Sequence, residues 1–185
     1  PMVESKGLIS AFTGPFSLLY PLQHFQKYFY KQEFCDEINA LKERIKVSVE
    51  KDEVFDFLSG AAGISYSLMN GYEVKKDQEF LDIAKLYGDY LVQQVHILND
   101  SQMAWKNPAT NTYLGGLAHG TSGFALSLLR LAHLTGEENY REVAIKALNY
   151  DRSLFNPELS VWKDNRFDGK NYLHQWCHGS TGIGL

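Results

Sequence analysis

The sequence predicts an all-α fold, an α/α toroid in which buried inner helices alternate with amphipathic outer helices. The first observation is a repeat: a glycine that leads an apolar run recurs at Gly14, Gly63, Gly123 and Gly182, roughly every 50–60 residues. The second is that an amphipathic segment separates each of these stretches from the next. The third is that strand signals are few. Repeated helix pairs of this kind indicate a toroid or a helical solenoid.

The inner helices are expected to begin near the repeated glycines. The four stretches read "AFTGPFSLLY", "SGAAGISYSLM", "HGTSGFALSLL" and "HGSTGIGL". A helix that is apolar on most sides is buried, and a glycine at its start lets a neighbouring backbone approach closely. The N-termini of these helices, with their free N–H groups and positive dipole ends, would then gather at one mouth of the toroid.

The outer helices are expected over residues 33–49, 77–95 and 137–149. Apolar side chains recur there at helical spacing, as at Ile38 and Leu41 in the first segment. Short strands are expected at "MAW" and "SVW", in the loops that precede the third and fourth inner helices. Each repeat therefore consists of one buried and one covering helix.

Composition excludes several classes of protein. A chain of 185 residues with 44% hydrophobic and 22% charged side chains is typical of one globular domain. The net charge of −4 and the lack of a basic stripe argue against nucleic acid as a partner. No apolar run approaches the ~18 residues of a membrane span, so no transmembrane segment is expected. The N-terminal "PMVESKGLIS" lacks the features of a secretory signal.

The two cysteines, Cys35 and Cys177, are too few for a disulfide scaffold, and we expect a reducing cytoplasm. Cys35 lies on the apolar side of a predicted outer helix and is interpreted as a packing residue. A chain that begins with Pro1 rather than Met is expected to be a piece of a longer protein.

Side chains that precede the repeated glycines would converge at the mouth of the toroid. They are Asp56 with Ser59, His119, and the adjacent pair Cys177-His178. Each has a structural alternative. Asp56 could cap a helix, and Cys177 could be a small buried apolar residue. Either histidine could be a packed hydrogen-bonding residue. The Cys-His pair gains weight because "AHG" stands at the same place in the preceding repeat.

At these residues the sequence resembles a known family. "GGLAHGTSGFALSLLRLAHLTGEENY", "NYDRSLFNPELSVWKDNR", "WCHGSTGIGL" and, in the preceding repeat, "FDFLSGAAGISYSLM" are similar to the lanthionine synthetase cyclase family. The resemblance is greatest to the C-terminal cyclase domain of class II (LanM-type) lanthipeptide synthetases. It spans nearly all of residues 1–185. It implies a partial LanC-like domain, about half of the full barrel.

The resemblance implies a zinc-dependent cyclase that acts on a precursor peptide. Cys177 matches the first zinc-binding cysteine of the family, His119 matches a proposed acid/base, and Asp56 matches an aspartate proposed to assist proton handling. The family's other zinc ligands lie in a later "CHG" motif, so this chain alone is expected to hold zinc weakly and to be inactive. The remainder of the synthetase chain is then a further partner, and the setting is the bacterial cytoplasm.

The implied chemistry suits these residue types. A free thiol is mostly protonated at neutral pH, and zinc coordination deprotonates it. Addition of the thiolate to a dehydrated serine or threonine leaves a carbanion that a histidine could protonate. Three alternatives remain open: a different thiol addition on the same fold, a non-catalytic peptide-binding toroid, and an α/α-barrel glycosidase. The last would need paired carboxylates at the mouth, where only Asp56 is expected.

Overall fold

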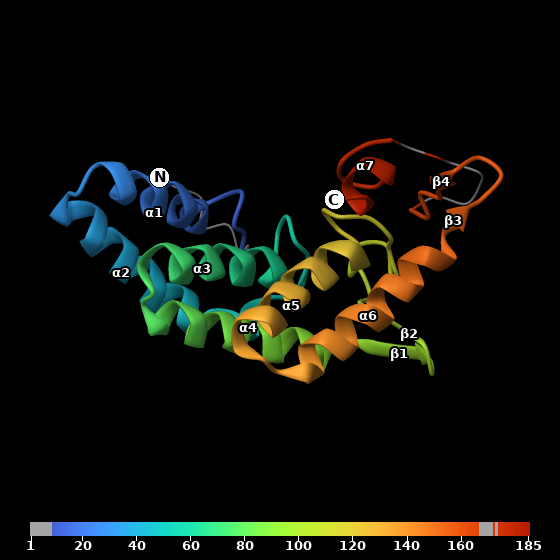
Figure 1. The fold of residues 1–185 in the computed structure, drawn as a ribbon, viewed down its shortest axis with the longest axis horizontal. Helices are drawn as coiled ribbons and strands as arrows, with labels where there is room; N and C mark the ends of the chain where they lie inside the picture. Colours follow the sequence, from blue (N-terminus) through green and yellow to red (C-terminus); the bar gives the residue numbers. More distant parts are fainter. Residues whose placement is uncertain (1–8, 167–171, 173) are drawn as a thin grey trace. The chain divides into compact units, whose positions relative to one another are not determined.

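The computed structural model describes residues 9–166, 172 and 174–185, and it divides the chain into two compact units, Pro1–Tyr90 and Leu91–Leu185 (Figure 1). Helices dominate both, as predicted. The first unit contains η1 (Pro15–Leu18), α1 (Leu19–Tyr28), α2 (Gln32–Lys46), η2 (Val49–Lys51), α3 (Ala61–Lys75) and most of α4 (Gln78–Gln94). The second contains β1 (His96–Asn99), β2 (Gln102–Ala104), α5 (Thr121–Thr135), α6 (Glu138–Ser153), β3 (Phe155–Asn156), β4 (Val161–Trp162) and α7 (Ser180–Ile183).

Three of the predicted inner helices, α3, α5 and α7, begin in the same register. Gly63, Gly123 and Gly182 each occupy the third position of their helix. At two of these positions a side chain would collide with backbone: a Cβ on Gly63 would overlap the carbonyl oxygen of Phe57, and one on Gly182 that of Trp176. At Gly63 and Gly182 the glycine is therefore required by the close approach of the loop that precedes the helix.

The first repeat differs from the others in detail. Gly14 lies before its helix, at φ +69°, and Pro15 opens the 3₁₀ turn that leads into α1. A proline at the first helical position favours this arrangement because it has no N–H to leave unsatisfied. The predicted helix does begin near Gly14, but α1 leaves Tyr20 and Phe25 about half exposed, at 45% and 52%. It is thus less buried than α3 or α5.

The outer helices α2, α4 and α6 match their predicted ranges within a few residues. α4 agrees with the prediction at both ends to within one residue, whereas α2 ends at Lys46 and α6 continues to Ser153. The predicted apolar face of α2 is buried, with Ile38 and Leu41 at 2% and 0% exposure. In the second unit α5 and α6 form an antiparallel pair (Figure 1).

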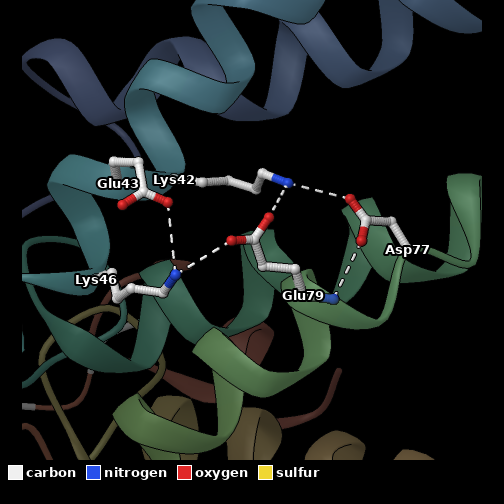
Figure 2. Close-up of polar contacts among 5 residues, drawn as sticks. All are labelled: Lys42, Glu43, Lys46, Asp77 and Glu79. Atoms are coloured by element: carbon white, nitrogen blue, oxygen red, sulfur yellow. Dashed lines mark hydrogen bonds and ion pairs between the residues drawn. The ribbon is translucent and has the colours of Figure 1, made fainter.

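An ion-pair network ties α2 to the start of α4 (Figure 2). The ammonium of Lys42, which is 5% exposed, bonds Glu79 and lies 3.1 Å from Oδ2 of Asp77, while Lys46 lies 3.1 Å from the other oxygen of Glu79. Burial alone would lower the pKa of Lys42, but its hydrogen bonds to the two carboxylates outweigh burial and raise that pKa. Hydrogen bonds from Lys42 and Lys46 hold the pKa of Glu79 below its ordinary value.

The core of the second unit forms around Trp105. Its ring stacks on Phe124 of α5 with centroids 4.3 Å apart, and its indole N–H donates to the carbonyl of Leu91 at 2.8 Å. The strands expected at "MAW" and "SVW" are present as β2 and β4, and each pairs with a strand that the sequence did not predict, β1 and β3. Within the described ranges no helix is both long and apolar enough to cross a membrane.

Candidate functional site

In the second unit, the loop before α5 and the loop before α7 pack backbone against backbone. The amide N–H of Ala118 donates to the carbonyl of Cys177 at 3.1 Å. Gly116 makes this approach possible: its φ is +107°, and a Cβ there would lie 2.7 Å from the oxygen of Cys177 and 2.9 Å from Cα of His178. Glycine alone among residues combines that dihedral with so little bulk. Segments some sixty residues apart in sequence thus meet at the predicted site.

This contact brings two predicted site residues side by side. The rings of His119 and His178 are nearly parallel, with centroids 5.3 Å apart and planes inclined by 24°. His119 is half-buried and His178 is 6% exposed. The adjacent Cys177 is also half-buried, and its Sγ lies 3.9 Å from Oε1 of Gln175. The structure therefore places a thiol and two imidazoles around the N-terminal ends of two inner helices.

A charged pair, Asp164 and Arg166, adds to the electrostatics of this region, and sequence reasoning missed it. Arg166 donates two hydrogen bonds to the carboxylate of Asp164, from Nη2 to Oδ2 at 2.7 Å and from Nε to Oδ1 at 3.0 Å. Burial would raise the pKa of Asp164, but Arg166 outweighs it and that pKa falls below its ordinary value. Asp164 also interacts electrostatically with His178, and Arg166 with Cys177. "KDNR" gave a weak signal, as a polar run that directly follows a strand.

A buried carboxylate, also missed, anchors the loop that carries His119. Asp151 of α6 is 1% exposed, accepts a hydrogen bond from the hydroxyl of Ser122 in the first turn of α5, and accepts another from the amide of Gly116 at 3.3 Å. Burial raises the pKa of Asp151 to about 6, although these hydrogen bonds oppose the rise. A negative charge at a helix N-terminus is favoured by the helix dipole. Asp151 thereby fixes the loop relative to α5 and α6.

A buried aspartate also anchors a helix start in the first unit, where Asp52 binds the first turn of α3. Its carboxylate accepts hydrogen bonds from the amides of Val54 and Ala61, the latter being the first residue of α3. Burial raises the pKa of Asp52 above its ordinary value. Asp56, the predicted proton-handling residue, is 1% exposed in the same loop and accepts a hydrogen bond from the amide of Ser59 at 2.6 Å. This contact lies within the loop and does not cap α3, whose N-cap residue is Gly60. A catalytic role for Asp56 stays a prediction.

The donor chemistry fits part of a zinc site. A thiol beside an imidazole, as at Cys177 and His178, supplies the sulfur and nitrogen ligands that zinc prefers. Over the described ranges, however, no three side chains of His, Cys, Asp or Glu are grouped so that they could hold a metal ion. The described residues can therefore contribute to a zinc site without completing one.

Comparisons with known proteins bear on the family and the fold of this chain. Residues 4–185 match the family model described as "Lanthionine synthetase C-like protein". The chain is 24% identical over 186 aligned residues to the lacticin 481/lactococcin biosynthesis protein LcnDR2 of Lactococcus lactis subsp. lactis, across 97% of this chain and 17% of that protein. Its fold resembles nisin cyclase with a TM-score of 0.68 at 18% identity, across 98% of this chain and 53% of that one.

The chain thus spans well under two thirds of the length of either protein, and the structural likeness bears out the predicted α/α-toroid fold class. Because the family match covers almost the whole chain, the assignment does not depend on the cysteine-histidine motif alone. This chain belongs to the lanthionine synthetase C-like family.

Proposed function

We propose that this chain is part of a cyclase that forms thioether (lanthionine) rings, by adding cysteine thiols of a precursor peptide to dehydrated serine or threonine residues. The observation that carries the proposal is the meeting of His119 with Cys177 and His178 at two inner-helix N-termini, within a chain of this family. The rest of a larger synthetase chain is the expected covalent partner, by likeness to relatives that are longer than this chain.

The reaction needs two proton movements and one new bond. The peptide thiol loses its proton, its sulfur bonds to the β-carbon of the dehydrated residue, and the carbon–carbon double bond becomes single. The electron pair left on the α-carbon takes up a proton. We assign that donation to His119, because imidazole is the side chain best suited to general acid catalysis near neutral pH. Its half-buried ring remains open to a bound peptide while His178 lies against one face.

Cys177 is proposed as one ligand of a zinc ion whose ligand set the described residues do not complete. Zinc bound there would hold the substrate thiol in its reactive thiolate form. The chain's own contribution is position: the bond from Ala118 to the carbonyl of Cys177 fixes the cysteine backbone beside His119. The guanidinium of Arg166, held by Asp164, adds positive charge to the region around the thiol.

Zinc content separates the two proposed roles. We expect the complete protein to retain zinc after dialysis against a mild chelator, and Cys177→Ala to lose it. His119→Ala should retain zinc, because the histidine is assigned to proton transfer rather than coordination. Cys35→Ala is the matched control: this cysteine lies on α2, where its sulfur contacts the side chain of Gln26, and its loss should not change metal content. Metal is measured by elemental mass spectrometry.

Four results would contradict these assignments. Zinc retained by Cys177→Ala would show that the ligand is misplaced, and zinc lost by His119→Ala would make the histidine a ligand or its support. A complete protein that binds dehydrated peptide without zinc and without consuming thiols would be a peptide-binding module. Consumption of glutathione but not of peptide thiols would identify a different thiol addition.

A further inference from the structure

A pocket lies within the first unit, and its lining includes neither His119, His178 nor Cys177. It has a volume of ≈ 570 Å³ and is formed by the loop before η1, by α1, by α3 and by the residue that follows Asp56. This volume is within the range of roughly 300–1,000 Å³ that is typical of small-molecule sites. None of the described residues that line it is charged. An occupant that fits must therefore be uncharged, because a buried charge without a partner is costly.

The walls of the pocket are aromatic. Phe57, at 6% exposure, meets the ring of Tyr66 edge-on with centroids 5.3 Å apart, and it lies 5.9 Å from the ring of Phe12. Phe12 and Tyr20 are 49% and 45% exposed, so they form the open rim. Rings arranged in this way favour another ring, which can stack on one wall and present its edge to the next.

A buried polar group belongs to the lining of the pocket. Ser67 of α3 lines the pocket, is 4% exposed, and has a buried hydroxyl with no hydrogen-bond partner among the described residues. A buried hydroxyl that makes no bond is unfavourable, and a ligand that reaches it removes that cost. Gly63, one turn earlier on the same helix, also lines the pocket.

The next repeat offers a matched comparison. Ser127 occupies in α5 the position that Ser67 occupies in α3, the seventh residue of the helix. It is 1% exposed and its hydroxyl likewise has no partner in the described part of the chain, but it does not line this pocket. A serine that serves only to keep this helix position small would behave alike in both repeats. If the serine instead bonds to a ligand, replacing it should weaken ligand binding in α3 alone.

We propose that this pocket binds an uncharged aromatic side chain with a polar tip, of the tyrosine class. The ring lies against Phe57 and Tyr66, and the phenol hydroxyl bonds to Ser67. That the ring belongs to a substrate peptide rests on the proposed function, whereas the chemistry of the pocket does not. The pocket would then select one aromatic residue of the peptide beside the loop that carries Asp56.

The test is a titration of the purified chain with N-acetyltyrosinamide and with N-acetylphenylalaninamide, followed by amide chemical shifts in two-dimensional NMR. We expect saturable shifts around Phe57 and the first two turns of α3. The tyrosine probe should bind about fivefold more tightly, the equivalent of one hydrogen bond. Ser67→Ala should remove that difference by weakening the tyrosine probe alone, and Ser127→Ala should leave both affinities unchanged. Tyr20→Ala, at the exposed rim, should weaken the binding of both probes without lowering the stability of the fold.

The proposal is overturned if neither probe gives saturable shifts, if the shifts lie away from α3, or if N-acetylglutamate binds as tightly as the tyrosine probe. Equal weakening of both probes by Ser67→Ala would also overturn it. Circular dichroism and thermal melting confirm that each variant is folded, and Tyr20→Ala supplies the test if Ser67→Ala is not. Since no zinc or dehydrated peptide is used, failure here is distinct from failure of ring formation in the complete protein.

Discussion

Replacing Gly116 with alanine should separate the loop before α5 from the loop before α7. At φ +107° an L residue is strained, and its Cβ would lie 2.7 Å from the carbonyl oxygen of Cys177 and 2.9 Å from Cα of His178. Both nearby atoms belong to the backbone, so no side-chain rotation relieves the clash. We expect the loops to part and the hydrogen bond from Ala118 to Cys177 to break.

The expected cost follows from these two effects. Backbone strain at an unfavourable dihedral is about 1–3 kcal/mol, and a lost hydrogen bond contributes about 0.5–1.5 kcal/mol. Together they destabilise the variant by roughly 2–4 kcal/mol. Gly136 is the matched control, since it has φ +74° and a Cβ added there would meet no neighbouring atom within 4 Å. Gly136→Ala should therefore show the left-handed backbone cost alone, about 1–2 kcal/mol.

Urea unfolding followed by circular dichroism measures both free energies, and similar m-values confirm that the same transition is compared. The ring proton signals of His119 and His178 should shift in Gly116→Ala, because the two rings no longer lie together. They should be unchanged in Gly136→Ala. Equal stability losses in the two variants, or histidine signals that stay in place in Gly116→Ala, would show that the close backbone approach does not hold the loops together.

Two further predictions concern buried charge. Lys42→Met should lose roughly 1–3 kcal/mol of unfolding free energy, because two carboxylates lose their buried partner. Lys46→Met, at a more exposed ion pair, should lose clearly less, and equal losses in urea unfolding would contradict this. Burial raises the pKa of Asp151 to about 6 in the folded protein, which therefore holds this proton more tightly than the unfolded chain does. The contribution of Asp151 to stability is therefore full below about pH 4 and falls as the pH rises to about 6. The stability of wild type relative to Asp151→Asn should therefore drop by roughly 3 kcal/mol across that window; a constant difference would rule out the raised pKa. The comparison with the variant is needed because Glu79, whose pKa is lowered, acts in the opposite direction.

The repeat made much of the fold predictable. The spacing of Gly63, Gly123 and Gly182 located three inner helices, because each glycine occupies the third position of its helix. It also predicted that residues before these glycines come together, and the contact of His119 with His178 follows from that register. The roles assigned to these residues remain predictions.

Other features lay beyond sequence patterns for physical reasons. Asp151 anchors a helix that starts thirty residues before it, and the pairing depends on how α6 packs on α5. Local propensity carries no information about such a contact. Asp52 was missed similarly, since its bond to Ala61 spans nine residues of irregular loop. The pocket around Ser67 was missed because separate segments must fold together before it exists.

The loops that carry His119 and Cys177 are proposed to form part of a thioether-forming site, and free-thiol counting tests this without intermediate steps. A dehydrated precursor peptide is incubated with the complete protein, and its remaining thiols are alkylated and counted by mass spectrometry. We predict that wild type and His133→Ala, an exposed histidine of α5, consume the thiols equally. His119→Ala should do so about 10²–10⁴-fold more slowly. Thiols that persist with wild type, or that disappear as fast with His119→Ala, would show that these loops do not carry out ring formation as proposed.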